Sequence, residues 1–192
     1  DQELVVQVLQ GDQEAFAELV ERYQRAVYNL SYRMLGSAQE AEDAAQESFL
    51  RAYQHLKRYD PDRPFKTWLL SITSNYCIDR LRKRRLTWLS LDEPLPAHPA
   101  LSSQGPGPEA VAVTGERDRR LQDMLAELAP EYRAAVILRY WYDMSYAEIA
   151  ELLDTTESAV KSRLFRARRM LAERLHGPET NGLTVAMGGV SS

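Results

Sequence analysis

The stretch SYAEIAELLDTTESAVKSRLFR, residues 145–166, predicts two helices joined by a tight turn. Ser145 and Glu148 have the spacing of a capping box, which marks the start of a helix. A short polar run, DTT, then separates the first helix from the second. Apolar residues of the second helix, Val160 and Leu164, return at helical spacing to pack on the first. This is the pattern of a helix-turn-helix, although a small bundle with a basic surface helix would share the same periodicity.

The second helix of this pair has an outer face that suits contact with duplex DNA. In helix-turn-helix proteins the corresponding face enters the major groove. Basic residues also cluster around the same helix, which favours a polyanion as its ligand. The residues at helical spacing on the outer face, and therefore the predicted duplex-binding residues, are Ser158, Lys161, Ser162, Phe165 and Arg166.

Apolar residues recur at helical spacing over most of the chain upstream. A helix entered from Asp12 is predicted over about residues 14–34. A second follows the capping pattern of Ser37 and Glu40, and a third begins after the proline-bounded turn at residues 59–64. The predicted buried stripe of the second helix is Ala45, Phe49, Tyr53 and Leu56, and that of the third is Phe65, Trp68, Leu69, Ile72 and Tyr76. The chain is therefore predicted to be all-α.

The composition changes sharply between the two halves of the chain. Residues 86–115 contain no Lys or Arg and are rich in Pro and Gly, which is typical of a tether. We predict two small helical domains, an N-terminal helical bundle at residues 1–85 and a C-terminal helix-turn-helix domain at residues 118–176. A flexible linker at 86–117 would join them, and a mobile tail would follow at 177–192.

The net charge of -4 conceals two basic patches. Residues 61–85 carry seven basic and two acidic groups, a net charge of +5, and residues 156–176 carry six and two, a net charge of +4. Residues 1–60 are acidic, with a net charge of -5. Two solvated helix faces could give this layout, but it also suits a polyanion held at two places and a separate partner bound elsewhere.

The first basic patch interleaves cations with aromatic rings. This combination fits single-stranded DNA, because bases stack on rings while cations hold phosphates. By periodicity Phe65, Trp68 and Tyr76 belong to the core, whereas Tyr59, in the proline-bounded turn, is predicted to be an exposed contact. The cations of this patch that the aromatic residues lie close to in sequence are Lys66, Arg80, Arg82, Lys83, Arg84 and Arg85.

An acidic face is predicted on the second helix, opposite its buried stripe. It consists of Asp43, Gln46, Glu47 and Leu50. Acidic residues repel DNA, so this face is either an ordinary solvated surface or a docking surface for another protein.

Other classes of function lack support in the sequence. The histidines His55, His98 and His176 are scattered, Cys77 is the single cysteine, and there is no glycine-rich phosphate loop. We therefore expect no catalytic residues, metal or cofactor. There is also no membrane-spanning run or secretory signal, which predicts a cytoplasmic protein without membrane insertion.

Several motifs closely resemble those of the extracytoplasmic-function (ECF) sigma factors, in the family's order and separation. They are Asp43–Tyr53, Phe65–Ile72 with Asn75 and Asp79–Arg85, Leu128–Arg133, and Ser145–Ala150. The resemblance covers about residues 2–85 and 118–175. It implies an alternative sigma factor, which binds core RNA polymerase and directs promoter recognition, promoter melting and transcription initiation.

The resemblance also implies roles for individual residues. Asp43, Gln46, Glu47 and Leu50 would contact core polymerase at the clamp helices of its largest subunit, and the flap of the second-largest subunit would be a further contact. The -10 element, opened to single strands, would be bound by Tyr59, Lys66, Asn75, Arg80, Lys83 and Arg84. The outer-face residues from Ser158 to Arg166 would read the -35 element as duplex. An anti-sigma factor is a further expected partner. Glu157 departs from the pattern by bringing a negative charge to the recognition helix.

One alternative comes from a different class, a stand-alone helix-turn-helix regulator. It would need only residues 118–176. It would leave the aromatic and basic features of the first half of the chain without a role.

Overall fold

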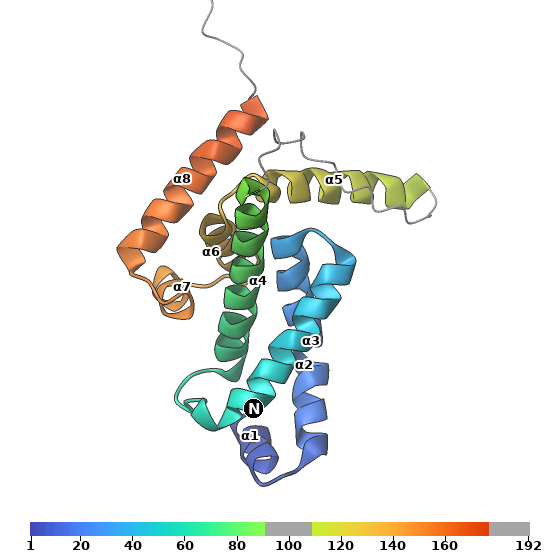
Figure 1. Cartoon of the computed structure of the whole chain (residues 1–192), viewed down its shortest axis with the longest axis vertical. Helices are drawn as coiled ribbons and strands as arrows, with labels where there is room; N and C mark the ends of the chain where they lie inside the picture. The colour runs from blue at the N-terminus through green and yellow to red at the C-terminus, as the bar shows by residue number, and fades with distance from the viewer. Residues whose placement is uncertain (91–108, 177–192) are drawn as a thin grey trace, which may run out of the picture.

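The computed structural model describes residues 1–90 and 109–176, and every regular element in these ranges is helical (Figure 1). The predicted all-α class is confirmed. Most of the predicted linker, residues 91–108, and the predicted tail lie outside the described residues. The elements are α1 (Gln2–Leu9), α2 (Gln13–Leu35), α3 (Ala38–His55), the short 3-10 helix η1 (Leu56–Arg58), α4 (Phe65–Ser90), α5 (Glu109–Ala126), α6 (Pro130–Trp141), α7 (Tyr146–Leu152) and α8 (Glu157–His176).

The ends of α2 and α3 are fixed by residues whose sequence signals are clear. The Asp12 carboxylate accepts a hydrogen bond from the backbone N–H of Glu14 at 2.9 Å, which caps α2. Gly36 ends α2 with a φ of 77°, a left-handed conformation that glycine adopts without the steric cost of a Cβ. Ser37 then accepts from the N–H of Glu40 and caps α3. The chain therefore reverses sharply between two antiparallel helices.

The first helical domain is built on α2, α3 and α4, with α1 packed against α2. The sequence reading did not find α1, whose Val5 and Val8 are buried. Burying a large apolar side chain contributes roughly 1.5–3 kcal/mol, against about 0–1 kcal/mol for an exposed ion pair, so the core rather than the surface charges holds this domain together. Its largest fully buried side chains are Leu19, Val27, Leu30, Met34, Phe65, Leu69 and Leu70.

The second helical domain contains the predicted helix-turn-helix, formed by α7 and α8. The capping box of Ser145 and Glu148 is confirmed, with both reciprocal hydrogen bonds present. Asp154 makes the turn with a φ of 47°, which aspartate tolerates better than most residues. Val160 and Leu164 of α8 are buried against α6 and α7, as predicted.

The structure corrects the predicted burial of Tyr53 and the predicted ends of the linker. Tyr53, predicted to be buried, is 46% exposed, although its ring meets that of Phe16 edge-on at 4.9 Å. Helix α4 continues to Ser90 and α5 begins at Glu109, so both ends of the predicted linker are helical. Helix α4 extends past residue 85 because a helix that has formed propagates cooperatively, and residues 86–90 contain no Pro or Gly to interrupt it. The predicted domain limits at residues 85 and 118 stay a prediction.

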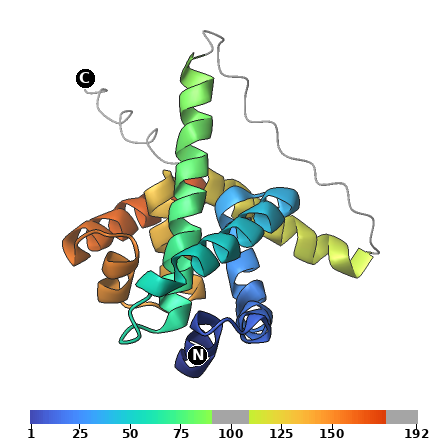
Figure 2. The same cartoon turned by 60° about the horizontal axis from the view of Figure 1, so that its bottom comes forward.

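The two domains pack against each other, which the tether reading did not anticipate. Helices α6 and α7 contact α4, and α5 and α6 contact α2. In both views α4 runs between α2 and α3 on one side and α7 and α8 on the other (Figures 1 and 2). One continuous apolar cluster includes Leu30, Met34, Leu70, Cys77 and Ile78 of the first domain with Ala134, Ile137, Leu138 and Met144 of the second.

A buried arginine joins the two domains through backbone carbonyls. Arg133 is 7% exposed and donates to the carbonyl oxygen of Met34 at 2.5 Å and to that of Ala126 at 2.7 Å. Burial lowers the pKa of Arg133 to about 10, so the guanidinium keeps its charge at neutral pH. Met34 lies in the last turn of α2, where backbone carbonyls lack partners within the helix.

We expect the Arg133→Met substitution to lower the free energy of unfolding by about 2 kcal/mol, because it leaves buried carbonyl oxygens without donors. Urea unfolding followed by circular dichroism would measure the loss. The matched control is Arg169→Met, which removes an exposed arginine that forms a surface ion pair with Glu173 at 3.2 Å. Equal losses in the two variants would contradict a special role for Arg133.

Candidate nucleic-acid interface

The outer face of α8 is open, as the sequence predicted. All five predicted residues on this face are exposed: Ser158, Lys161, Ser162, Phe165 and Arg166. Phe165 is 62% exposed, which is unusual for a phenylalanine and suits contact with the methyl group of a thymine. Thr156 caps the helix by accepting from the N–H of Ala159 at 3.1 Å. The rigid cap and the buried opposite face of α8 fix the direction in which this outer face points.

Polar contacts on α8 hold its two outer-face cations in place. Lys161 lies 3.9 Å from the Glu157 carboxylate, and its ammonium group lies 5.8 Å from the centre of the Tyr146 ring. Arg166 donates to the Tyr132 hydroxyl of α6 at 3.1 Å. The acidic Glu157, the departure from the family pattern, thus sits beside a cation of its own helix. Such an exposed pair is weak and can exchange for a phosphate.

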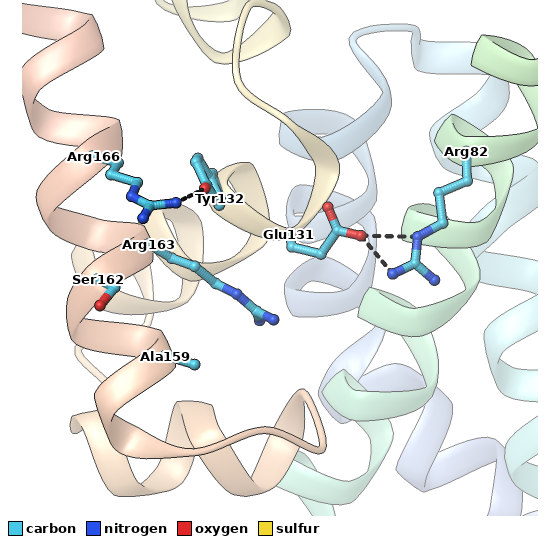
Figure 3. Close-up of a pocket in the computed structure, with 7 residues that line it drawn as sticks. All are labelled: Arg82, Glu131, Tyr132, Ala159, Ser162, Arg163 and Arg166. Carbon is cyan, nitrogen blue, oxygen red and sulfur yellow. Dashed lines mark hydrogen bonds and ion pairs between the residues drawn. The ribbon is translucent and has the colours of Figure 1, made fainter.

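A hollow lies between α8, α6 and α4 (Figure 3). Arg82 reaches into it from α4 and forms a forked ion pair with Glu131 at 2.5 and 2.8 Å. Burial favours the neutral form of Glu131, but hydrogen bonds from its own backbone and from Arg82, with the charges of Arg82 and Arg163, lower its pKa below the ordinary value. The hollow is lined by Arg82, Glu131, Tyr132, Ala159, Ser162, Arg163 and Arg166.

The prediction that Tyr59 is exposed is wrong. Its side chain is 8% exposed, and its ring packs against Phe65 at 5.6 Å and Trp68 at 5.2 Å between ring centres. Its hydroxyl donates to the Arg63 carbonyl oxygen at 2.5 Å, which fixes the loop before α4. Proline-bounded turns are usually exposed, but an aromatic side chain within one can fold back onto the core. Tyr59 and Phe65 still line a shallow hollow beside residues 61–64.

The other residues predicted to bind the -10 element do not form a single surface. Asn75 and Lys83 are exposed on α4. Arg80 and Arg84 instead turn to α3, where both contact the Glu40 carboxylate. Burial lowers the pKa of Arg84.

Lys66, at the start of α4, contacts the second domain. Its ammonium group lies 5.8 Å from the centre of the Tyr142 ring at the end of α6. Of the six residues predicted to bind the -10 element, Arg80 and Arg84 therefore share one carboxylate, that of Glu40, and Lys66 faces the other domain.

The predicted acidic face of α3 is largely open. Asp43 and Gln46 are exposed, and Leu50 is 52% exposed. Glu47 is half-buried and pairs with Arg51 at 2.6 Å, and Arg51 in turn lies over the Tyr76 ring of α4. The surface thus combines acidic and amide groups with an exposed leucine.

Several contacts in this region carried no sequence signal. Arg63 pairs with Glu151 of α7 at 2.9 Å, and Glu131 pairs with Arg82 across the domains. No periodicity relates residues that lie in different domains, so only the tertiary structure could find these pairs.

Two negative observations apply to the described ranges. Among residues 1–90 and 109–176, no three His, Cys, Asp or Glu side chains are grouped so that they could hold a metal ion. Within the same ranges, no helix combines the length and apolar character that a membrane crossing requires.

These features define a DNA-binding protein of two helical domains, the second of which carries a helix-turn-helix with a basic outer face. Comparison with known families agrees with both halves of this description. Residues 19–87 match Sigma-70 region 2, and residues 118–171 match Sigma-70, region 4.

Individual relatives show which group within the sigma-70 family the chain resembles. The chain is 38% identical over 176 residues to the ECF RNA polymerase sigma factor SigW of Bacillus subtilis (strain 168), covering 89% of this chain and 94% of SigW. It is 34% identical over 181 residues to the ECF RNA polymerase sigma-E factor of Escherichia coli (strain K12), covering 91% and 94% of the two chains. The chain belongs to the ECF sigma factors of the sigma-70 family. It is an alternative sigma factor that directs transcription initiation.

The solved structures agree with this assignment. CnrH, solved in complex with the cytosolic domain of CnrY, has a TM-score of 0.67 and 27% identity, covering 92% of this chain and 97% of CnrH. Matches to both sigma regions rule against a stand-alone regulator, which would need only the second domain.

Proposed function

We propose that the outer face of α8 reads the -35 element of the promoter as duplex DNA. The observation that carries this assignment is the simultaneous exposure of Ser158, Lys161, Ser162, Phe165 and Arg166 on the second helix of the helix-turn-helix. Arginine and lysine donate to guanine in the major groove, serine bonds bases or phosphates, and phenylalanine contacts thymine methyl groups. Glu157 leaves Lys161 when a phosphate takes its place.

The -10 element, opened to single strands, binds along α4 and the loop before it. Lys83 is exposed and can bind a phosphate directly, whereas Lys66 must leave the Tyr142 ring and Arg80 and Arg84 must exchange Glu40 for a phosphate. Asn75 offers an exposed amide that can bond the edge of a flipped base. Tyr59 is not the exposed DNA contact that its position in the proline-bounded turn suggests. Its buried ring forms a wall of the hollow beside residues 61–64, and its hydroxyl holds the loop in shape.

One face of α3 docks on core RNA polymerase, at the clamp helices of the largest subunit; it consists of Asp43, Gln46, Glu47 and Leu50. The second domain contacts the flap of the second-largest subunit. The acidic character of the α3 face supports this division, because it would repel promoter DNA. The chain then acts in the cytoplasm with its polymerase and supplies no catalytic group, metal or cofactor of its own.

An anti-sigma factor is a further partner in this proposal. The sigma factor RpoE of Bartonella quintana, solved in complex with the anti-sigma factor NepR, shares the fold of this chain with a TM-score of 0.62 and 23% identity. An anti-sigma factor would act by covering the α3 face.

The test of the -10 assignment is the Asn75→Ala substitution in run-off transcription with core polymerase. Base extraction costs a few kcal/mol of pairing and stacking, so the loss of a pocket group should reduce initiation on a duplex promoter by about tenfold. It should have less effect on a template already opened at -10.

The matched control is Asn29→Ala, which removes an exposed asparagine from α2. It should leave initiation on both templates unchanged. Equal losses for Asn75→Ala on both templates would overturn the role in melting.

A further inference from the structure

The loop between η1 and α4, residues 59–64, is shaped by hydrogen bonds within itself. The Tyr59 hydroxyl donates to the Arg63 carbonyl oxygen at 2.5 Å, and the Arg63 N–H donates to the Asp60 carbonyl oxygen at 3.1 Å. The Asp62 N–H donates to the Asp60 carboxylate at 3.0 Å. Each of these bonds joins two residues of the loop, so together they fix its turns but not its position on the domain.

A side chain of α1 reaches the same loop from outside. The Gln2 amide nitrogen, Nε2, donates to the Pro61 carbonyl oxygen at 2.6 Å. Both views place α1 at the same end of the first domain as the loop before α4, and α1 contacts η1 (Figures 1 and 2). The hydrogen bond of Gln2 therefore ties the loop to a helix from a distant part of the sequence.

Helix α1 is itself held firmly enough to support the loop. Its buried side chains, Val5 and Val8, belong to the same apolar cluster as the Tyr59 ring. Its N-cap residue, Asp1, pairs with Arg22 of α2 at 2.6 Å. Because the helix is anchored both along its buried face and at its first residue, the direction from which Gln2 approaches the loop is fixed.

The shallow hollow beside residues 61–64 lies between α1 and this loop. Asp1, Gln2 and Glu3 line it from α1, and Tyr59, Phe65 and residues 61–64 line it from the loop and the start of α4. The bond between Gln2 and Pro61 joins one side to the other. The width of the hollow therefore depends on this bond.

We propose that the first turn of α1 is the second wall of the hollow that receives the flipped -10 base, and that Gln2 is a positioning residue that fixes the width of the hollow. The inference rests on the proposed function, because it takes this hollow to be the base site. Supporting side chains must hold a recognition site to within about 0.5 Å if it is to select one ligand. A loop that can move away from α1 would accept several bases.

The choice of base should therefore depend on Gln2, whereas other steps should not. Polymerase docking is assigned to α3, and the -35 element is assigned to α8. Neither surface includes α1, so loss of the bond to Pro61 should leave both interactions unchanged. A role confined to the choice of one base separates a positioning residue from one that only stabilises the fold.

The test uses two substitutions of Gln2 and a matched control. Gln2→Met keeps the length of the side chain but removes the N–H donor, whereas Gln2→Lys keeps a donor of similar reach. The control, Gln10→Met, makes the same change at the other end of α1. Gln2 and Gln10 are both exposed, so all three variants should unfold at the temperature of the unchanged chain.

The readout is run-off transcription with core polymerase from a promoter selected from a random duplex library. Each -10 position is replaced in turn by the other three bases, and the initiation rate with the preferred base is divided by the mean rate with the others. We expect Gln2→Met to lower this ratio about fivefold at one position, a loss that corresponds to one neutral hydrogen bond. Gln2→Lys and Gln10→Met should keep the ratio of the unchanged chain.

Three results would overturn the inference. They are an unchanged ratio for Gln2→Met at every position, an equal fall for Gln10→Met, and a fall for Gln2→Met that is accompanied by weaker binding to core polymerase. Loss of the ratio in Gln2→Lys would contradict the role of the donor. Failure of the proposed function would show separately, as an Asn75→Ala variant that loses no more on a duplex promoter than on a template opened at -10.

Discussion

Replacing Asp43, Gln46 and Glu47 together with alanine is expected to weaken binding to core RNA polymerase by on the order of 100-fold, which corresponds to about 2.7 kcal/mol. A few central residues carry most of the energy of a protein interface, and loss of charged or hydrogen-bonded partners there leaves the partner's groups unpaired. The three side chains lie on one helix, beside the exposed Leu50. The fold should be unaffected, because their neighbours Ala44 and Ser48 form the buried side of α3.

Co-elution with core polymerase and run-off transcription would measure this loss. The matched control replaces Glu14, Glu21 and Gln24 of α2 with alanine, which removes the same number of carboxylates and amides from exposed positions. The control should bind as the unchanged chain does. If the α3 variant bound core polymerase as tightly as the unchanged chain does, this face would be an ordinary solvated surface and not a polymerase contact.

Replacing Lys161 and Arg166 together with alanine is the second substitution with a large expected effect. Each cation that contacts a base or phosphate contributes roughly 1–3 kcal/mol, so the loss of two should weaken promoter binding by about 100-fold or more. The reduction should be greatest at low salt. The dependence of log affinity on log salt should fall by about 1.8, because two fewer counterions are released.

Binding of the holoenzyme to a promoter selected from a random duplex library would measure both effects. The control replaces Arg119 and Arg120 of α5, which are exposed and carry the same total charge. This control tests whether the loss of promoter affinity comes from the α8 side chains or only from the lower net charge of the chain. An equal fall in the salt dependence for the two variants would contradict the -35 assignment.

The sequence predicted the helices well at positions where a single residue has a clear structural role, such as capping a helix end. Asp12 and Ser145 act as caps because their side-chain oxygens reach backbone N–H groups that the helix itself cannot satisfy. The outer face of α8 was also predictable, because the residues between its exposed positions, Val160 and Leu164, are apolar at helical spacing. Tyr53 and Tyr59 were misjudged because tyrosine has both an apolar ring and a polar hydroxyl, and either can face solvent.

The amino-acid sequence was enough to predict an all-helical chain with a helix-turn-helix, two basic patches and the motifs that it shares with the ECF sigma factors. These features depend on spacing along one helix or on composition within one segment. The packing of the helices was needed to find that Glu131 pairs with Arg82, that Arg133 reaches the end of α2, and that Arg80 and Arg84 both contact Glu40. Such partners lie tens of residues apart, and their meeting depends on how whole helices pack, for which a repeat of three or four residues carries no information.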